Sequence, residues 1–337
     1  MPPARATEPA PGLRRRAAPL WKIRPRHQGI ARTWLRIAAA CLAGAATLPA
    51  APAWASPAQP ETAGKVPART PVVHPALWKV SDEDTTIWLF GTIHVLPEPV
   101  NWDTGAVAKA LAASDTLVTE VPMDDNRAAQ VTMARLSQRD DGKNLRDTLP
   151  PKVRTAYEEA MTSLGLPVGA FDANDGWFAA LMLSLIPLQA SGFDLANGID
   201  KQITEAAIAQ GKAREALETP EYQLGQFETL SPKTQAAYLA EVIEALPTMK
   251  SDIGDMVEAW KNGKAEKLAE ILNEQESDPA IREALLTTRN ANWTKWIEQR
   301  LATPGTVFMA VGAGHLAGKD SVQALLARDG VKAVRVQ

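Results

Sequence analysis

The sequence predicts an α/β fold, in which a mixed β-sheet core bears two strand–Gly-x-x-His units and a large helical insertion. The first unit is TIWLFGTIH at residues 86–94, and the second is TVFMAVGAGH at residues 306–315. Continuous β-branched and aromatic runs of this kind, without polar alternation, are typical of strands buried on both faces. Helical patterns fill most of the chain between the two units, and a helix and a last strand follow the second, so strands frame a helical middle.

Each unit ends in a glycine and a histidine that follow the strand. The glycine permits a sharp turn or the close approach of a ligand to the backbone. His94 and His315 then lie just past the carboxyl ends of their strands, where open α/β sheets bind ligands. A single histidine beside a strand is more often a hydrogen-bonded structural residue, but these two of the chain's four histidines share one context. We therefore expect them to share a site, as ligands or as a general base.

Residues 1–55 have the pattern of a Gram-negative-type secretory signal peptide. Basic residues precede an apolar run at 37–48, and Ala53-Trp54-Ala55 forms a small-residue cleavage pattern. The apolar run is too short for a stable membrane span. We therefore expect a periplasmic or secreted protein, anchored in the membrane only if cleavage fails. Residues 56–76 are rich in Pro and Ala, which predicts an extended linker before a single domain at 77–337.

Removal of the signal peptide makes the chain acidic. Nine of the 36 Lys and Arg and one of the 39 Asp and Glu precede residue 56, so the remainder holds 27 basic and 38 acidic residues, a net charge of −11. An acidic chain without a basic stripe argues against a nucleic-acid partner and against docking on anionic membranes. The only cysteine, Cys41, is lost with the signal peptide, which excludes disulfides and thiolate chemistry in the mature protein.

The strands of the predicted sheet are short apolar runs with turn residues between them. Residues 77–80 and 86–90 flank Asp-Glu-Asp, which indicates a hairpin. Residues 115–121 and 213–217 have the composition of further strands. Residues 331–336 form the last predicted strand, so the chain ends in a βαβ unit.

Helices are expected over most of the remaining chain, and Asp103 is expected to cap the first of them. The stretch 176–188 is almost entirely apolar but too short to cross a bilayer, so it is either a buried helix or the wall of a substrate groove. His74, in the linker, is expected to be exposed and without a role. The helical insertion spans about residues 124–301, and the predicted helices are 103–113, 126–137, 151–164, 176–188, 198–209, 232–246, 253–260, 264–273, 279–301 and 318–328.

Four further polar residues stand where a site can use them. Glu120 and Glu218 each end an apolar run, and a buried carboxylate must be paired, hydrogen-bonded or bound to a metal. The alternative for Glu120 is a solvent-facing position or a simple pair with an arginine. Asp200, in the first turn of a helix, either favours the helix dipole or holds a site group. Arg289 lies one turn before Trp293, so it is either a surface cation stacked on the indole or the cation of an anionic site.

Several short motifs follow one another in a fixed order along the mature chain. They are LFGTIH with Leu96-Pro97, Thr119-Glu120, Gly198-Ile199-Asp200, Leu217-Glu218-Thr219 with Gln223, Arg289-Asn290-x-x-Trp293, and VGAGHL with Gly318. In order and spacing they resemble the TraB/GumN family across essentially the whole mature chain. That family includes the animal Tiki proteins, regarded as divalent-metal-dependent proteases, and its fold is similar to those of erythromycin esterases and the haem-binding ChaN proteins. The resemblance implies an α/β core with helical insertions and a site built from both Gly-x-x-His motifs and a glutamate.

The activity that the resemblance implies is metal-assisted hydrolysis, most simply of a peptide. His94, Glu120 and His315 are the implied ligands of one divalent ion, with zinc, manganese and cobalt as the candidates. Such an ion lowers the pKa of bound water and polarises the scissile carbonyl. No His-Glu-x-x-His helix is present, so an ordinary zincin is excluded.

Four other residues are expected to support this reaction. Arg289 is expected to stabilise the developing oxyanion, with Asn290 orienting it. Glu218 or Asp200 is expected to act as an extra ligand or as the general base. The substrate is a peptide or another small molecule.

Two other functions fit the same residues. A metal-free hydrolase uses one histidine as the general base and Glu120 or Glu218 to orient it, as the esterase resemblance allows. No Gly-x-Ser-x-Gly elbow is present, which disfavours a serine nucleophile. A non-enzymatic periplasmic binder of a peptide or of haem uses the histidines as ligands, although tyrosines, which also serve haem sites, are few.

Overall fold

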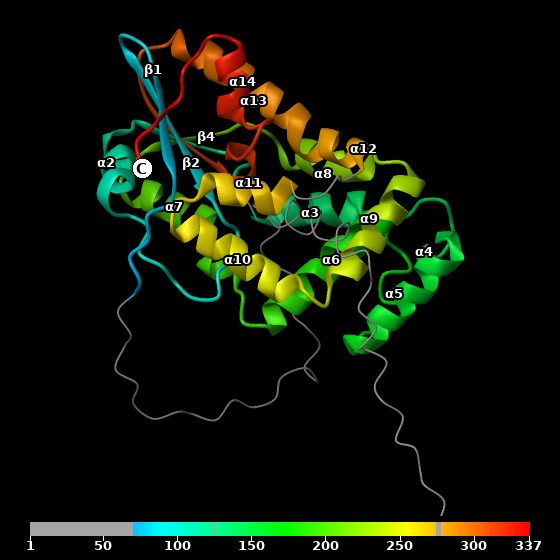
Figure 1. The fold of residues 1–337 in the computed structure, drawn as a ribbon. Coiled ribbons are helices and arrows are strands. Elements are labelled where there is room, and N and C mark those ends of the chain that lie inside the picture. Colours follow the sequence, from blue (N-terminus) through cyan, green and yellow to red (C-terminus); the bar gives the residue numbers. More distant parts are fainter. Residues whose placement is uncertain (1–69, 124–125, 274–277) are drawn as a thin grey trace, which may run out of the picture.

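The structure is a computed structural model that describes residues 70–123, 126–273 and 278–337 (Figure 1). The predicted signal peptide, its Cys41 and most of the predicted linker lie outside these residues. The end of that linker is described, and it contacts the domain. Val73 donates a backbone hydrogen bond to Asn101 and is buried, and the backbone of His74 donates to Lys261. The side chain of His74 is exposed, as predicted.

A single mixed sheet of six strands forms the core of the described chain, which confirms the predicted fold class. Its order is β4-β3-β5-β2-β1-β6. The four strands β4, β3, β5 and β2 run parallel, and β1 and β6 add antiparallel pairs at one edge. The strands are β1 Leu77–Ser81, β2 Thr85–Thr92, β3 Thr116–Thr119, β4 Ala213–Ala216, β5 Gly305–Gly312 and β6 Val334–Arg335.

The two strands of the Gly-x-x-His units are neighbours at the centre of this sheet. β2 and β5 pair in parallel along their whole length, from Thr85 opposite Gly305 to Thr92 opposite Gly312. The two units therefore end at the same edge of the sheet, although more than 200 residues separate them in the sequence. The parallel ladder brings the two histidine-bearing turns side by side.

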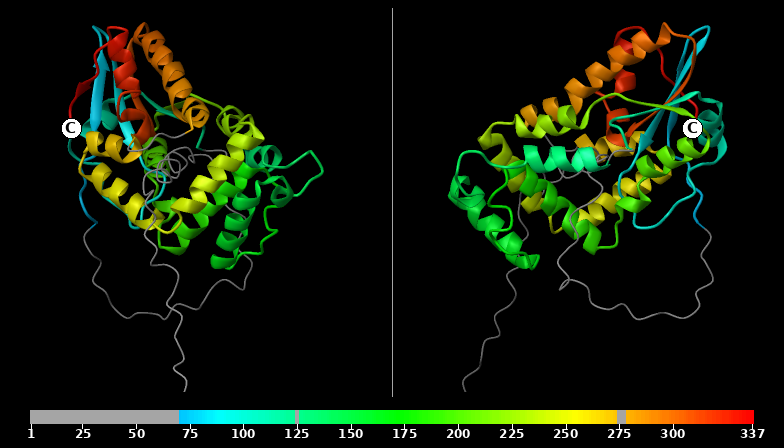
Figure 2. Two further views of the ribbon diagram at one scale, coloured as in Figure 1. Left: turned by 45° about the vertical axis from the view of Figure 1, so that its right-hand side comes forward. Right: turned by 180° about the vertical axis from the view of Figure 1, so that it is seen from behind.

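Both faces of the central strands are covered, which confirms the prediction from their unbroken apolar composition. Ile87, Leu89 and Met309 belong to a core that includes Trp293 and Ile297 of one helix layer. Phe90 and Phe308 belong to the larger core on the other face, which continues into the helical middle. Figure 2 shows the helices of the last part of the chain beside the strands and the helical middle at the opposite end of the molecule.

The helical middle packs around one nearly all-apolar helix, α6 (Gly176–Ala190). Trp177 of α6 is fully buried and stacks on Phe227 at a centroid distance of 5.6 Å. Most of α6 is buried in the core, which agrees with the first of the two predicted alternatives, a buried helix or the wall of a substrate groove. Among the described residues, none of the helices combines the length and apolarity of a membrane span.

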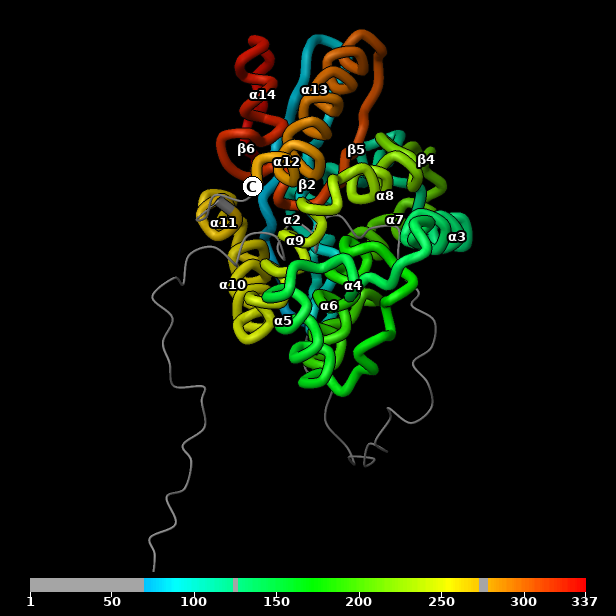
Figure 3. The backbone as a smooth tube through the Cα atoms, turned by 90° about the vertical axis from the view of Figure 1, so that its right-hand side faces the viewer, coloured from blue at the N-terminus to red at the C-terminus, as the bar shows by residue number. Residues whose placement is uncertain are grey.

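The observed helices follow the predicted ones with small shifts at their ends. The helices outside α6 are α2 Gly105–Ala113, α3 Asn126–Leu136, α4 Leu145–Thr148, α5 Pro151–Ser163, α7 Ile199–Ala209, α8 Pro220–Glu228, α9 Pro232–Ala245, α10 Met249–Lys261, α11 Ala265–Asn273, α12 Pro279–Arg282, α13 Thr288–Leu301 and α14 Val322–Arg328. Two short helices, α4 and α8, were not predicted, because short segments show little apolar periodicity. Figure 3 shows α13 and α14 beside the strands, and α4, α5, α6 and α10 in the lower part of the view.

The chain is helical from Pro279 to Leu301, as predicted, with a π-helical turn, Glu283–Thr287, between α12 and α13. Two local predictions were wrong. Thr104, not Asp103, stands at the N-cap of α2, without a capping side-chain hydrogen bond. The last strand has only two residues, Val334–Arg335, because only these pair with β1. β6 nevertheless runs parallel to β5, with β2 and β1 between them, as the predicted βαβ crossover requires.

Candidate functional site

All seven predicted site residues are buried, and the parallel sheet positions four of them. His94, Glu120, Glu218 and His315 each follow the carboxyl end of a strand, namely β2, β3, β4 and β5. Because these strands run parallel and adjacent, the four side chains start from one edge of the sheet, the edge at which open α/β sheets bind ligands. Arg289 and Asn290 come from α13, and Asp200 comes from the first turn of α7.

The guanidinium of Arg289 is the centre of the site. It is completely buried and donates to both oxygens of Glu218, with Nε 2.8 Å from Oε1 and Nη2 2.8 Å from Oε2. Nη2 also donates to Glu120 Oε2 at 2.6 Å, and Nη1 lies 3.2 Å from His315 Nε2 and donates to the carbonyl of Leu285. The prediction left open a surface arginine stacked on an indole. The structure buries Arg289 as the cation between two carboxylates, and its guanidinium also lies over the indole of Trp293, 4.8 Å from the ring centroid.

The two carboxylates are held by further donors. Glu120 accepts from the backbone N–H of Gly312 at 2.7 Å and from Gln223 at 2.9 Å, and Glu218 accepts from the indole of Trp293 at 3.0 Å. Burial raises the pKa of Glu218, and the attraction of Arg289 offsets only part of that effect. Two carboxylates facing one guanidinium leave an excess of negative charge, which suits a site that takes up a cation or a proton.

His315 is held by its Nδ1 atom. Nδ1 lies 2.6 Å from Oδ1 of Asn290, an oxygen that can only accept, so Nδ1 carries the proton and Nε2 carries the lone pair. Burial, and then the cation of Arg289, lower the pKa of His315 well below its ordinary value, so the ring is neutral. Nε2 lies 3.9 Å from Glu120 Oε1, and the ring lies against Trp293 with centroids 4.4 Å apart.

His94 is held in a different way. Its Nδ1 lies 2.5 Å from Oδ2 of Asp200, while Oδ1 of Asp200 accepts from the hydroxyl of Thr92 at 2.6 Å. Burial acts to raise the pKa of Asp200, but the electrostatic attraction of His94 and the hydrogen bonds from His94 and Thr92 outweigh it, so this pKa is lowered. His94 also contributes to the lowered pKa of His315, which places both histidines within one electrostatic environment.

The predicted residues therefore fall into two contact groups at one sheet edge. Glu120, Glu218, Arg289, Asn290 and His315 form one hydrogen-bonded network. His94 and Asp200 form the other. Asn290 had been expected to orient Arg289, whereas its described contacts are with His315 and with the carbonyl of Asp320, at 2.8 Å.

Three residues of the site had no predicted role. Trp293 and Gln223 belong to the motifs. The indole N–H of Trp293 donates to Glu218, and the side-chain amide of Gln223 donates to Glu120. Thr92 lies inside the first Gly-x-x-His motif and contacts Asp200. A polar side chain within an otherwise apolar strand is the signal that could have identified Thr92, because a buried hydroxyl needs a partner.

The side chains of His94, Glu120 and His315 offer the types of donor atom, imidazole nitrogen and carboxylate oxygen, that bind divalent ions. Two imidazoles, of which His315 is neutral with its lone pair on Nε2, and one carboxylate make the donor set of many metal hydrolases. Donors about 2.1 Å from a common ion are at most about 4.2 Å apart, and His315 Nε2 and Glu120 Oε1 are 3.9 Å apart. Among the described residues, no group of three or more His, Cys, Asp and Glu is arranged closely enough to form a metal site.

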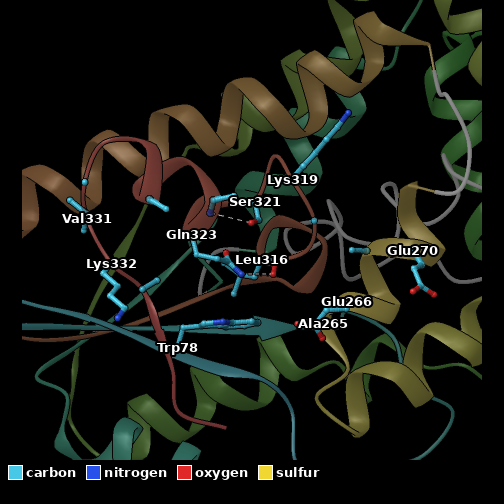
Figure 4. A pocket seen from close by; sticks show the side chains of 16 residues that line it. Trp78, Ala265, Glu266, Glu270, Leu316, Lys319, Ser321, Gln323, Val331 and Lys332 are labelled. Atoms are coloured by element: carbon cyan, nitrogen blue, oxygen red, sulfur yellow. Dashed lines mark hydrogen bonds between the residues drawn. The ribbon is translucent and has the colours of Figure 1, made fainter.

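A surface pocket of about 1000 Å³ lies beside the second Gly-x-x-His turn. Leu316, the residue after His315, forms part of its wall together with Trp78, and Gln323 donates to the carbonyl of Leu316 at 2.6 Å (Figure 4). The seven predicted site residues do not line this pocket. The pocket and the site share the turn that carries His315 and Leu316, and Asn290 of the site donates to the carbonyl of Asp320, between the pocket residues Lys319 and Ser321.

Comparisons with known proteins agree with the motif order. A sequence model described as the TraB/PrgY/gumN family matches residues 76–335. The chain is 24% identical to the uncharacterized protein YbaP of Escherichia coli K12 over 238 residues, which cover 71% of this chain and 86% of the relative. YbaP of Shigella flexneri matches to the same extent. No solved structure matches the chain significantly.

Proposed function

The chain belongs to the TraB/PrgY/gumN family, and on that premise we propose that it is a metal-dependent hydrolase, with a peptide as the substrate. His94, Glu120 and His315 would hold one divalent ion. When bound, such an ion lowers the pKa of water and polarises a carbonyl. Zinc, manganese and cobalt all suit a set of two imidazoles and one carboxylate.

The observation that best supports this proposal is that Nδ1 of each histidine lies within hydrogen-bond distance of a buried side-chain oxygen. Asp200 lies 2.5 Å from Nδ1 of His94, and Asn290 lies 2.6 Å from Nδ1 of His315. Histidines that bind metals almost always donate the other ring N–H to a carboxylate or carbonyl oxygen, which fixes the tautomer and the ring orientation. Two residues from unrelated parts of the chain supply that support here.

The remaining residues have roles that their contacts suit. Arg289 is the one guanidinium in the described network, and it supports a developing oxyanion by electrostatic stabilisation. Glu218 and Trp293 hold that guanidinium in place. Glu218 is also the candidate general base, since burial raises its pKa and so makes its carboxylate a stronger base. Oδ2 of Asp200 lies 2.5 Å from Nδ1 of His94, so we assign Asp200 the role of holding that imidazole.

Metal content tests the proposal directly. The full-length chain is purified as wild type, His94→Ala, His315→Ala and His74→Ala, and its metals are measured by mass spectrometry. The exposed His74 is the matched control. We expect one divalent ion per chain in the wild type and in His74→Ala, its loss in the other two variants with unchanged circular dichroism, and peptide cleavage that depends on that ion. A wild-type chain that takes up no ion from zinc, manganese or cobalt solutions would rule the proposal out.

One contact favours a second candidate, a metal-free hydrolase. Nη1 of Arg289 lies 3.2 Å from Nε2 of His315, at the nitrogen that an ion would need. In that function, the histidine of the Asp200–His94 pair acts as the general base and Arg289 stabilises the oxyanion. Hydrolysis of peptides or esters that persists in excess chelator, and that is lost in His94→Ala, would favour this candidate over the first.

A further inference from the structure

The hydroxyl of Thr92 contacts the carboxylate of Asp200 that holds His94, and no role was predicted for it. Thr92 is the last residue of β2 and is 2% exposed. Its Oγ1 donates to Oδ1 of Asp200 at 2.6 Å, a short hydrogen bond of the kind that a charged acceptor forms. The backbone of Thr92 is fixed by the parallel ladder, in which it pairs with Gly312. The hydroxyl therefore approaches Asp200 from a rigid part of the sheet.

Asp200 is brought to this hydroxyl by the docking of α7. The N–H of Ile199 donates to the carbonyl of Ile93 at 2.9 Å. Gly198 lies so close to the loop that a Cβ there would overlap the carbonyl oxygen of His94. The sequence Gly198-Ile199-Asp200 is thus a docking segment for the first Gly-x-x-His turn. Its carboxylate has one oxygen on Thr92 and the other on His94.

The second Gly-x-x-His turn lacks this arrangement. Ala313 occupies the place that Thr92 has in the first motif, two residues before the histidine. Without a hydroxyl there, the ring of His315 is held by Asn290 from α13 instead. The two motifs share a backbone pattern, but the sequence gives a hydroxyl only to the one whose histidine is held by a carboxylate.

We infer that Thr92 is a positioning residue for the proposed metal site, and that it acts through Asp200 to keep Nδ1 of His94 protonated and the lone pair on Nε2. The inference rests on the proposed function, because the purpose of fixing this tautomer is metal binding, but the tautomer itself can be measured without metal. A carboxylate with only one fixed oxygen can rotate about its Cβ–Cγ bond. The hydrogen bond from Thr92 fixes the second oxygen, so the first stays aligned with the imidazole.

The test is the tautomer of His94, read by two-bond ¹H–¹⁵N spectra of full-length protein labelled at histidine, without added metal and at mildly alkaline pH. The chain has four histidines, so His94→Gln and His315→Gln assign the two site signals. Thr92→Val removes the hydroxyl at nearly constant shape, and Thr92→Ser restores it. Thr85→Val is the matched control, because Thr85 is an equally buried threonine at the other end of β2 that bonds the carbonyl of Thr303.

We expect wild-type His94 to show protonated Nδ1 and unprotonated Nε2. Thr92→Val should shift and broaden both His94 signals without moving those of His315, Thr92→Ser should return them, and Thr85→Val should leave them unchanged. Where the wild type binds zinc, Thr92→Val should weaken the affinity about 10- to 100-fold, as other losses of such support do.

Two results would overturn the inference. One is a wild-type His94 with the proton on Nε2, which needs no variant and so holds even if Thr92→Val fails to fold. The other is a folded Thr92→Val with unchanged His94 signals. A chain that binds no metal but shows the expected tautomer shifts would refute the proposed function alone and leave the positioning role of Thr92 in place.

Discussion

Replacement of Arg289 by methionine should strongly destabilise the fold, because two buried carboxylates depend on this one cation. Arg289→Met introduces an apolar side chain of similar length and removes every hydrogen bond from the guanidinium to Glu218 and Glu120. Both carboxylates remain buried, at 8% and 2% exposure, with the donors Trp293, Gln223 and Gly312 but no opposite charge.

The expected cost follows from this geometry. Removing one partner of a buried ion pair destabilises a protein by about 3–5 kcal/mol, because the other charge is left uncompensated. For a domain of this size each kcal/mol lowers Tm by about 2–4 °C, so we expect a decrease of roughly 10 °C. The folded variant should hold an extra proton on one carboxyl, so its deficit should be smallest at low pH and grow as the pH rises.

Urea and thermal unfolding, followed by circular dichroism, measure this cost. Arg328→Met is the control, since the Arg328 side chain is 60% exposed and lies 3.9 Å from Asp320, a contact expected to contribute less than about 1 kcal/mol. The double variant Arg289→Met/Glu218→Gln removes one stranded charge and should recover part of the loss. An Arg289→Met chain as stable as the wild type, or a double variant whose cost is the sum of the two single costs, would refute the idea of a central buried cation.

Two further predictions concern the same sheet edge. Gly198→Ala should displace the His94 turn and weaken metal uptake, because its Cβ would overlap a backbone carbonyl. The control is Gly254→Ala in α10, whose Cβ would meet nothing within 4 Å and which should raise Tm slightly. Equal effects of the two substitutions on Tm and on metal uptake would contradict the docking role of Gly198. Because burial raises the pKa of Glu218 above its ordinary 4.5, the folded state keeps this proton to a higher pH than the unfolded chain. Its contribution to the free energy of unfolding should therefore fall as pH rises from about 4.5 through the folded-state pKa, and Glu218→Gln should remove that slope in urea unfolding series; parallel curves for the two proteins would count against it.

The sequence alone determined the local features of the site. Unbroken apolar runs identified β2 and β5 as strands buried on both faces, because only side chains without polar groups can be covered twice. The position of His94, Glu120, Glu218 and His315 after such runs then implied that they emerge at strand ends. Parallel strands in one sheet end at one edge, so a shared site followed from the pattern before any contact was known.

The tertiary structure decided which of these residues touch. That β3 lies between β4 and β5, and β5 beside β2, depends on crossovers through the helical middle, which no short motif encodes. The partner of each histidine comes from far along the chain, Asp200 for His94 and Asn290 for His315. Arg289 in turn reaches between Glu120 and Glu218 only because α13 packs on the sheet. Local composition fixes burial and direction, whereas the pairing of charges depends on the packing of whole elements, and so it appears only in the folded chain.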